Sequence, residues 1–343
     1  MVHCEDWKEA ASGGFAQKIM NTRFAKYAWS VLGFNLAVIL WGAYVRATGA
    51  GAGCGSHWPL CNGEIIPRAT RVETTVEFIH RVSSGFALLL VVGLVVWVYR
   101  SYPKGHILRM GASFSLLFII TEALVGAGLV LFSWVAQDDS IGRVISMAVH
   151  LINTFLLLAA LTLTAWWASG GVRLTIPRNS LLTWSFGIGF MSVLLLGVSG
   201  AITALGDTLF PAGTLTEGFT QDFSATSHFL IRLRVWHPLM AILSGTYVML
   251  LSGLSGLFWE KRELRRHAVG VIALILMQLL AGLINLLLLA PVFMQIIHLL
   301  LADLIWIALV LLAANIFGIK EQSQATFAST TSPHVSLSGG LER

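Results

Sequence analysis

Residues 74–99 read TTVEFIHRVSSGFALLLVVGLVVWVY, an apolar run with a single histidine, His80, near its start. A run of this length can cross a bilayer as a helix, which needs about 20 mostly apolar residues. Similar runs follow the same pattern at residues 24–46, 108–133, 143–168, 180–204, 231–257, 267–289 and 292–316. The sequence therefore predicts an all-α integral membrane protein with eight transmembrane helices.

The composition supports lipid as the main solvent of this chain. Its 343 residues are 56% hydrophobic and 11% charged, whereas soluble domains carry about 25% charged residues. The formal net charge of +5 does not indicate nucleic-acid binding, because the basic residues lie in short loops between the apolar runs, where they orient the chain. No nucleic-acid partner is expected.

The loops also predict an orientation. More lysines and arginines lie on the side that holds both chain ends, for example Lys104 and Arg262, than on the other side. Cytoplasmic loops are the ones enriched in these residues. We therefore expect a multi-pass protein of the cell (plasma) membrane, with both termini cytoplasmic.

The chain repeats itself, because His80 and His237 lie 157 positions apart at matching places in the two halves. An even number of helices in each half keeps the halves parallel in the membrane. The repeat predicts two pseudo-symmetric four-helix bundles. The expected divisions are a cytoplasmic tail at 1–23, an N-terminal bundle at 24–168, a C-terminal bundle at 180–316 and a disordered cytoplasmic tail at 317–343.

Four histidines lie roughly one to two turns inside the even-numbered helices, at about 1.5 Å per residue: His80, His150, His237 and His298. A single histidine in a membrane helix is usually a packed, hydrogen-bonded residue, but four at one depth, two in each repeat, favour a functional set. Zinc usually needs three or four converging ligands. Two imidazoles that face each other across a bundle suit haem iron. We expect the pairs His80–His150 and His237–His298.

The first outer loop carries two cysteines, Cys54 and Cys61, within a glycine-rich stretch. On the outer side of a membrane disulfides persist. A disulfide that closes so short a loop stabilises the fold by roughly 2–3 kcal/mol in the loop-entropy model. The pair fits a plain structural disulfide or a redox-active pair next to a haem edge, and the sequence leaves both interpretations open.

Glu77 precedes His80 by three positions, so both lie on one helical face. A carboxylate in that place suits proton transfer, and a solvated interfacial residue is the alternative. Arginine forks match carboxylates. Three arginines lie near the outer helix ends, Arg46, Arg81 and Arg234. They therefore suit haem propionates, and contact with lipid headgroups is the alternative.

The sequence resembles the haem A synthase family across essentially the whole membrane region. The first half carries GAYVRATG at 42–49, WPLCNG at 58–63 and EFIHR at 77–81. The second half carries GDTLFP at 206–211 and QDFSATSHFLIRLRVWHP at 221–238. The first loop with its two cysteines, followed by Glu-x-x-His, is the specific part of this resemblance.

The resemblance implies an oxidoreductase that converts haem O to haem A, by successive hydroxylation of a ring methyl to a formyl group. It implies a substrate haem between His80 and His150, and a permanent haem b between His237 and His298. Glu77 matches the family's proposed catalytic carboxylate, and Cys54 and Cys61 match its first-loop cysteine pair. The partners implied are membrane lipid, a haem O synthase as haem donor, terminal oxidase assembly factors as acceptors, and a second copy in a homo-oligomer.

The chain departs from the family pattern in three places. Gly55-Ser56-His57 stands where many members have Pro-Asp, Glu122 replaces the usual glutamine of the third helix, and the later outer loop has no second cysteine pair. Glu122 aligns with Gln278 in the repeat, which favours a hydrogen-bonding role.

Two other functions fit part of the pattern. A dihaem cytochrome b that exchanges electrons with quinone shares the four histidines, but it needs neither the Cys54–Cys61 loop nor a carboxylate one turn from His80. A parallel-repeat transporter is expected to have broken helices and polar groups at mid-membrane, whereas the predicted helices here are largely unbroken.

Overall fold

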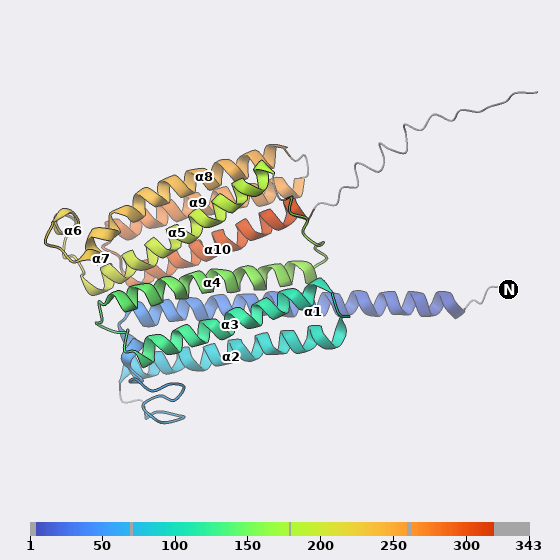
Figure 1. Ribbon diagram of the computed structural model, residues 1–343, viewed down its shortest axis with the longest axis horizontal. Helices are drawn as coiled ribbons and strands as arrows, with labels where there is room; N and C mark the ends of the chain where they lie inside the picture. Colours follow the sequence, from blue (N-terminus) through green and yellow to red (C-terminus); the bar gives the residue numbers. More distant parts are fainter. Residues whose placement is uncertain (1–4, 69–70, 178–179, 259–261, 319–343) are drawn as a thin grey trace, which may run out of the picture.

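The computed structural model describes residues 5–68, 71–177, 180–258 and 262–318 (Figure 1). The helices are α1 (Glu5–Ala47), the short 3-10 helix η1 (Ala50–Ala52), α2 (Val72–Ser101), α3 (Ile107–Leu131), α4 (Ile141–Ala168), α5 (Leu181–Leu209), α6 (Leu215–Phe223), α7 (Phe229–Arg234), α8 (Trp236–Phe258), α9 (Arg262–Leu287) and α10 (Val292–Phe317). The described residues form no β-strand, only an isolated bridge between Cys61 and Glu64. The predicted all-α class is therefore confirmed.

Eight helical segments within the described residues are long and apolar enough to cross a membrane. They coincide with the eight predicted runs, and α5 continues to Leu209 rather than ending at 204. Much of the expected tail at 1–23 is helical, because α1 begins at Glu5. The expected disordered tail at 317–343 lies, beyond its first two residues, outside the described residues.

The spanning helices pack as two neighbouring sets (Figure 1). Helices α1 to α4 pack on one another, and α5, α8, α9 and α10 form the second set. Between the sets, α10 packs against α4 and α1, while α4 also packs against α5. These sets contain the same helices as the two predicted bundles, while the symmetry between them stays a prediction.

The contact between α4 and α10 forms the centre of the molecule. The indole of Trp306 stacks on Phe155 with ring centroids 4.9 Å apart, and its Nε1 donates a 2.6 Å hydrogen bond to the Phe155 carbonyl. Large apolar side chains are exposed on every spanning helix. Soluble proteins rarely expose apolar surface on this scale. The chain is therefore a multi-pass membrane protein, and its two most buried spans, α4 and α10, lie where the two sets meet.

The second long loop contains a helix, α6, that the sequence interpretation treated as a polar stretch. The Thr214 hydroxyl accepts a hydrogen bond from the Glu217 amide (3.1 Å), and the Glu217 carboxylate accepts one from the Gly213 amide (2.9 Å). This is close to the reciprocal pattern of a capping box, which stabilises a helix start. The sixth predicted run is two helices, because the chain breaks at Val235 between α7 and α8.

The alternation of helices places the loop residues 48–68, α6 and α7 at one end and the turn between α2 and α3 at the other (Figure 1). We expect the first end outside the cell. In a Cys4→Ser background, Ile65→Cys, at an 81% exposed position, should react with a membrane-impermeant maleimide in intact cells. Lys104→Cys, exposed at the other end, should react only after permeabilisation. The reverse result would invert the predicted topology.

Candidate functional site

The histidines of the second helix set face each other across it. His237 lies on α8 and His298 on α10, with ring centroids 6.2 Å apart and ring planes at 79°. Two imidazoles on opposite sides of one metal, each with a metal–nitrogen bond of about 2 Å, have ring centres about 6 Å apart. The spacing of this pair therefore suits a single metal atom between the rings.

Polar side chains hold this pair from neighbouring helices. The Ser199 hydroxyl on α5 lies 2.9 Å from Nδ1 of His237. On α9, Nε2 of Gln278 lies 3.2 Å from Nε2 of His298. The ring orientation of a metal-binding histidine is commonly fixed by such contacts from outside the metal's own ligand set.

The histidines of the first set have a comparable environment. His80 on α2 and His150 on α4 lie close enough to interact electrostatically. Oε1 of Glu122 on α3 lies 3.4 Å from Nδ1 of His150, and Thr154 and Asn153 each donate a 2.5 Å hydrogen bond to the Glu122 carboxylate. Glu122 and Gln278 align in the sequence repeat. Glu122 lies beside His150 and Gln278 lies beside His298, so each contacts the histidine of the span that follows its own.

The side chains of both pairs fit an axially ligated haem. Nδ1 of His80 and Nδ1 of His298 are buried without a hydrogen-bond partner, although most buried polar atoms have one. Within the residues that the structure describes, no three or more His, Cys, Asp or Glu side chains gather as a metal site. Two imidazoles alone suit a metal that brings its own equatorial nitrogens, as haem iron does.

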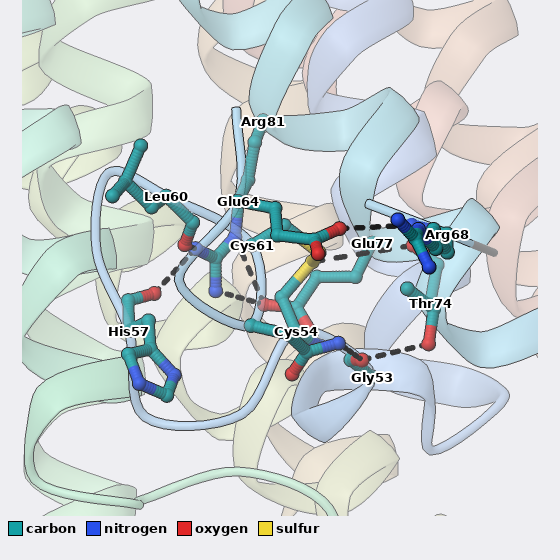
Figure 2. The surroundings of a disulfide bond; sticks show 11 residues. Gly53, Cys54, His57, Leu60, Cys61, Glu64, Arg68, Thr74, Glu77 and Arg81 are labelled. Atoms are coloured by element: carbon teal, nitrogen blue, oxygen red, sulfur yellow. Dashed lines mark hydrogen bonds and ion pairs between the residues drawn. A yellow bond between two sulfur atoms is a disulfide. The ribbon is translucent and has the colours of Figure 1, made fainter. Parts of the chain in front are cut away.

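The first loop is closed by a disulfide between Cys54 and Cys61, with the two Cα atoms 4.4 Å apart. Both cysteines are buried. Figure 2 shows how the loop is held against the start of α2, where the Thr74 hydroxyl donates a 2.8 Å hydrogen bond to the Gly53 carbonyl. The expected disulfide is present, and a redox role for it stays a prediction.

Glu77 joins this loop to α2. One carboxylate oxygen accepts a 2.8 Å hydrogen bond from the Cys54 amide, and the other pairs with the Arg81 guanidinium at 2.5 Å (Figure 2). Its residue exposure is 3%, so the alternative of a solvated interfacial carboxylate is wrong. An ion pair with a buried carboxylate therefore lies on α2 within one helical turn of His80 in the sequence.

Comparison with known proteins connects this geometry to a family. The model of the COX15-CtaA family, described as cytochrome oxidase assembly protein, matches residues 25–310. The chain belongs to this family. The match includes all four histidines and the disulfide loop.

Individual similar proteins carry two different names. A Thermus thermophilus protein named protoheme IX farnesyltransferase is 52% identical over 294 residues, which are 86% of this chain and 48% of that protein. An Exiguobacterium protein named heme A synthase is 27% identical over 190 residues, or 55% of this chain and 60% of its own length. A heme A synthase of Halalkalibacterium halodurans is 41% identical over 95 residues, 28% of this chain and 32% of its own length. The chain thus spans about half the length of the Thermus relatives.

In this member of the cytochrome oxidase assembly family, the three arginines expected near haem propionates contact protein groups. Arg46 donates to the Ala204 carbonyl (2.8 Å), Thr208 (3.0 Å) and Gln295 (2.8 Å). Arg81 donates to the carbonyls of His57 and Leu60 and pairs with Glu77. Arg234 pairs with Asp207 at 3.1 Å and with Asp222. Contacts of these arginines with propionates or lipid headgroups stay predictions.

The structure brings some of the predicted site residues together and separates others. Glu77, Cys54, Cys61 and Arg81 form one connected group next to His80. Arg234 belongs to a separate group with the two carboxylates of the second long loop.

Sequence interpretation missed Asn153 and Thr154, which hold Glu122. The sequence does indicate these residues, because they are two adjacent polar residues within an apolar span, three and four positions after His150.

Proposed function

We propose that this chain is a haem A synthase, which oxidises the ring methyl of haem O to a formyl group by successive hydroxylation. The observation that carries the proposal is the asymmetry between two otherwise similar histidine pairs. In the described part of the chain, the first pair alone has a disulfide-closed loop beside it, and the buried Glu77 carboxylate is bonded to that loop. The heme A synthase names of several relatives support the same reaction.

In this proposal His80 and His150 hold haem O as substrate, and His237 and His298 hold haem b. When bound, haem b supplies an electron-transfer centre within the same membrane protein. Glu122 orients the His150 imidazole through its 3.4 Å contact. Glu77 accepts protons released near His80, since a fixed carboxylate can take a proton and stabilise developing positive charge. The loop closed by Cys54 and Cys61 limits access of water from the outer end.

Farnesyl transfer to protohaem is the second candidate, because the Thermus relatives carry that name. Release of a diphosphate is commonly assisted by magnesium held by carboxylates. The described part of the chain contains no cluster of three or more acidic or other ligating side chains. Farnesyl transfer also leaves the two histidine pairs without a role, so haem A synthesis is the better-supported function.

The pigment of the purified protein separates these candidates. Expressed in a host that makes haem O but no haem A, the protein should yield haem B together with haem A on extraction. Haem B alone, with haem O in the membranes unchanged, would indicate the dihaem cytochrome b instead. New haem O formed from haem B and farnesyl diphosphate, in a host without its own haem O synthase, would indicate the transferase.

In this proposal a haem O synthase donates haem O to the chain, and terminal oxidase assembly factors accept haem A from it.

A further inference from the structure

Each of the four histidines meets a glycine on the span that precedes it. A Cβ atom built on Gly42 would lie 2.9 Å from Cε1 of His80, and one on Gly200 would lie 3.0 Å from Cε1 of His237. On Gly282 it would lie 3.0 Å from Cε1 of His298. The contact recurs in both halves, because the imidazole edge packs directly on the backbone of the neighbouring helix.

The fourth contact is looser. A Cβ atom on Gly126 would lie 3.9 Å from Cε1 of His150, an ordinary van der Waals distance, with no other neighbour within 4 Å. His150 instead has the Glu122 carboxylate 3.4 Å from its Nδ1. One imidazole of the first pair is therefore held by a polar side chain rather than by close packing on a backbone.

The close approach is not a general property of glycines in these helices. Gly33 on α1, Gly187 on α5 and Gly270 on α9 have nothing within 4 Å of a built Cβ atom. Glycine is unfavourable in a helix interior unless the backbone must approach something closely. On α5, a Cβ atom on Gly197 would also lie 3.0 Å from side chains, those of Leu151 and Phe155, so Gly200 differs from it in meeting an imidazole rather than in closeness.

We propose that Gly42, Gly200 and Gly282 are positioning residues that fix the imidazoles of His80, His237 and His298 through backbone contact, and that His150, held by the Glu122 side chain alone, is the axial ligand with more freedom to move. The proposal rests on the proposed function, in which one haem is a substrate and the other is permanent. A permanent haem needs two fixed ligands, and the second pair has two close glycine contacts. A substrate haem must enter and leave, and the first pair has one fixed and one movable imidazole.

The physical reason lies in the rigidity of a metal-bound ring. A free imidazole can rotate away from an added methyl group, since it lies at the end of a side chain. An imidazole bonded to iron could still turn about the iron–nitrogen axis, but it could not move sideways away from the methyl group without tilting that bond. An alanine at a close glycine therefore weakens haem binding rather than merely shifting a side chain, whereas alanine at Gly126 fills existing space.

The test compares alanine variants on the same helix. Gly200→Ala and Gly282→Ala, purified from a haem-producing host, should bind haem b about 10- to 100-fold more weakly than the wild type, the range typical of changes just outside a metal's ligands. Their low-spin bis-imidazole absorption spectrum should shift towards a high-spin form. Gly187→Ala and Gly270→Ala are the matched controls and should keep the wild-type haem content and spectrum.

The first pair is tested by haem transfer to apomyoglobin from protein loaded with added haem B at that site. Gly42→Ala should release this haem about 10- to 100-fold faster than Gly33→Ala, whereas Gly126→Ala should release it no faster than the wild type. In every variant the unaltered pair in the other half reports on folding, because its spectrum persists only in a folded protein.

Wild-type spectra and haem affinity in Gly200→Ala and Gly282→Ala would overturn the positioning role, as would equal losses in Gly187→Ala and Gly270→Ala. Equal haem release from Gly126→Ala and Gly42→Ala would overturn the distinction drawn for His150. These readouts measure haem binding and do not require haem A formation. If the wild type and the variants made no haem A, that result would count against the proposed function but not against the positioning role.

Discussion

Glu77→Gln is expected to abolish most haem A formation while haem b stays bound. Glu77 is the buried carboxylate nearest His80 in sequence, and its charge is balanced by Arg81 at 2.5 Å. Loss of a proton-transferring group typically costs about 10²- to 10⁴-fold in rate. The measurement is the ratio of haem A to haem O in membranes that contain equal amounts of each variant.

A matched control is needed because Glu77 also anchors the first loop through the Cys54 amide. Glutamine keeps one acceptor oxygen, so its NH2 group must face either the backbone amide of Cys54 or the Arg81 guanidinium. Both of these groups are donors, and one hydrogen bond is lost. Thr74→Val removes a second loop anchor, the hydrogen bond to the Gly53 carbonyl, without changing any charge. Thr74→Val should retain haem A formation and Glu77→Asp should retain part of it. Equal losses in Thr74→Val and Glu77→Gln would leave Glu77 as a loop anchor only.

His237→Ala or His298→Ala is expected to remove the permanent haem b, whereas His80→Ala or His150→Ala should leave it in place. The two rings of the second pair oppose each other at 6.2 Å between centroids, so neither can replace the other. Removal of an axial ligand should weaken binding by more than about 100-fold, since changes outside the ligand set already cost 10- to 100-fold. The reduced-minus-oxidised spectrum of each purified variant measures the loss.

His267→Ala provides the control for this series. Its ring lies on the surface of α9, where Nδ1 contacts the Glu263 carbonyl at 2.8 Å, and all haem should remain bound after the replacement. If all four helix histidines gave the same spectral loss, the two pairs would not be separate sites.

The spanning helices were predictable from sequence because the thickness of a bilayer sets a single length scale. The run at 74–99 became a helix at Val72–Ser101 for that reason. No comparable length limit applies to the loops. Helix α6 depends on local capping by Thr214 and Glu217, which is weak evidence in a stretch that otherwise reads as polar.

The candidate site was predictable where it depends on depth along a helix and not where it depends on rotation about the helix axis. Depth alone placed His237 and His298 at one level, and the structure brings their rings together. The contact of Gly200 with His237 requires a particular rotation and a close helix–helix approach, and neither is readable from one chain. For the same reason Arg46 was not expected to reach Gln295 on the last span.

The interface between the two helix sets is built mainly by the spanning helices α1, α4, α5 and α10. Trp306 and Phe155 pack at its centre, and Arg46 crosses it from α1 to α5 and α10. The described part of the linker, residues 169–177 and 180, adds contacts of its own, such as the 2.8 Å hydrogen bond from the Thr175 amide to the Phe317 carbonyl. We therefore expect two separately translated polypeptides, divided at this linker, to reassemble in the bilayer as a split protein.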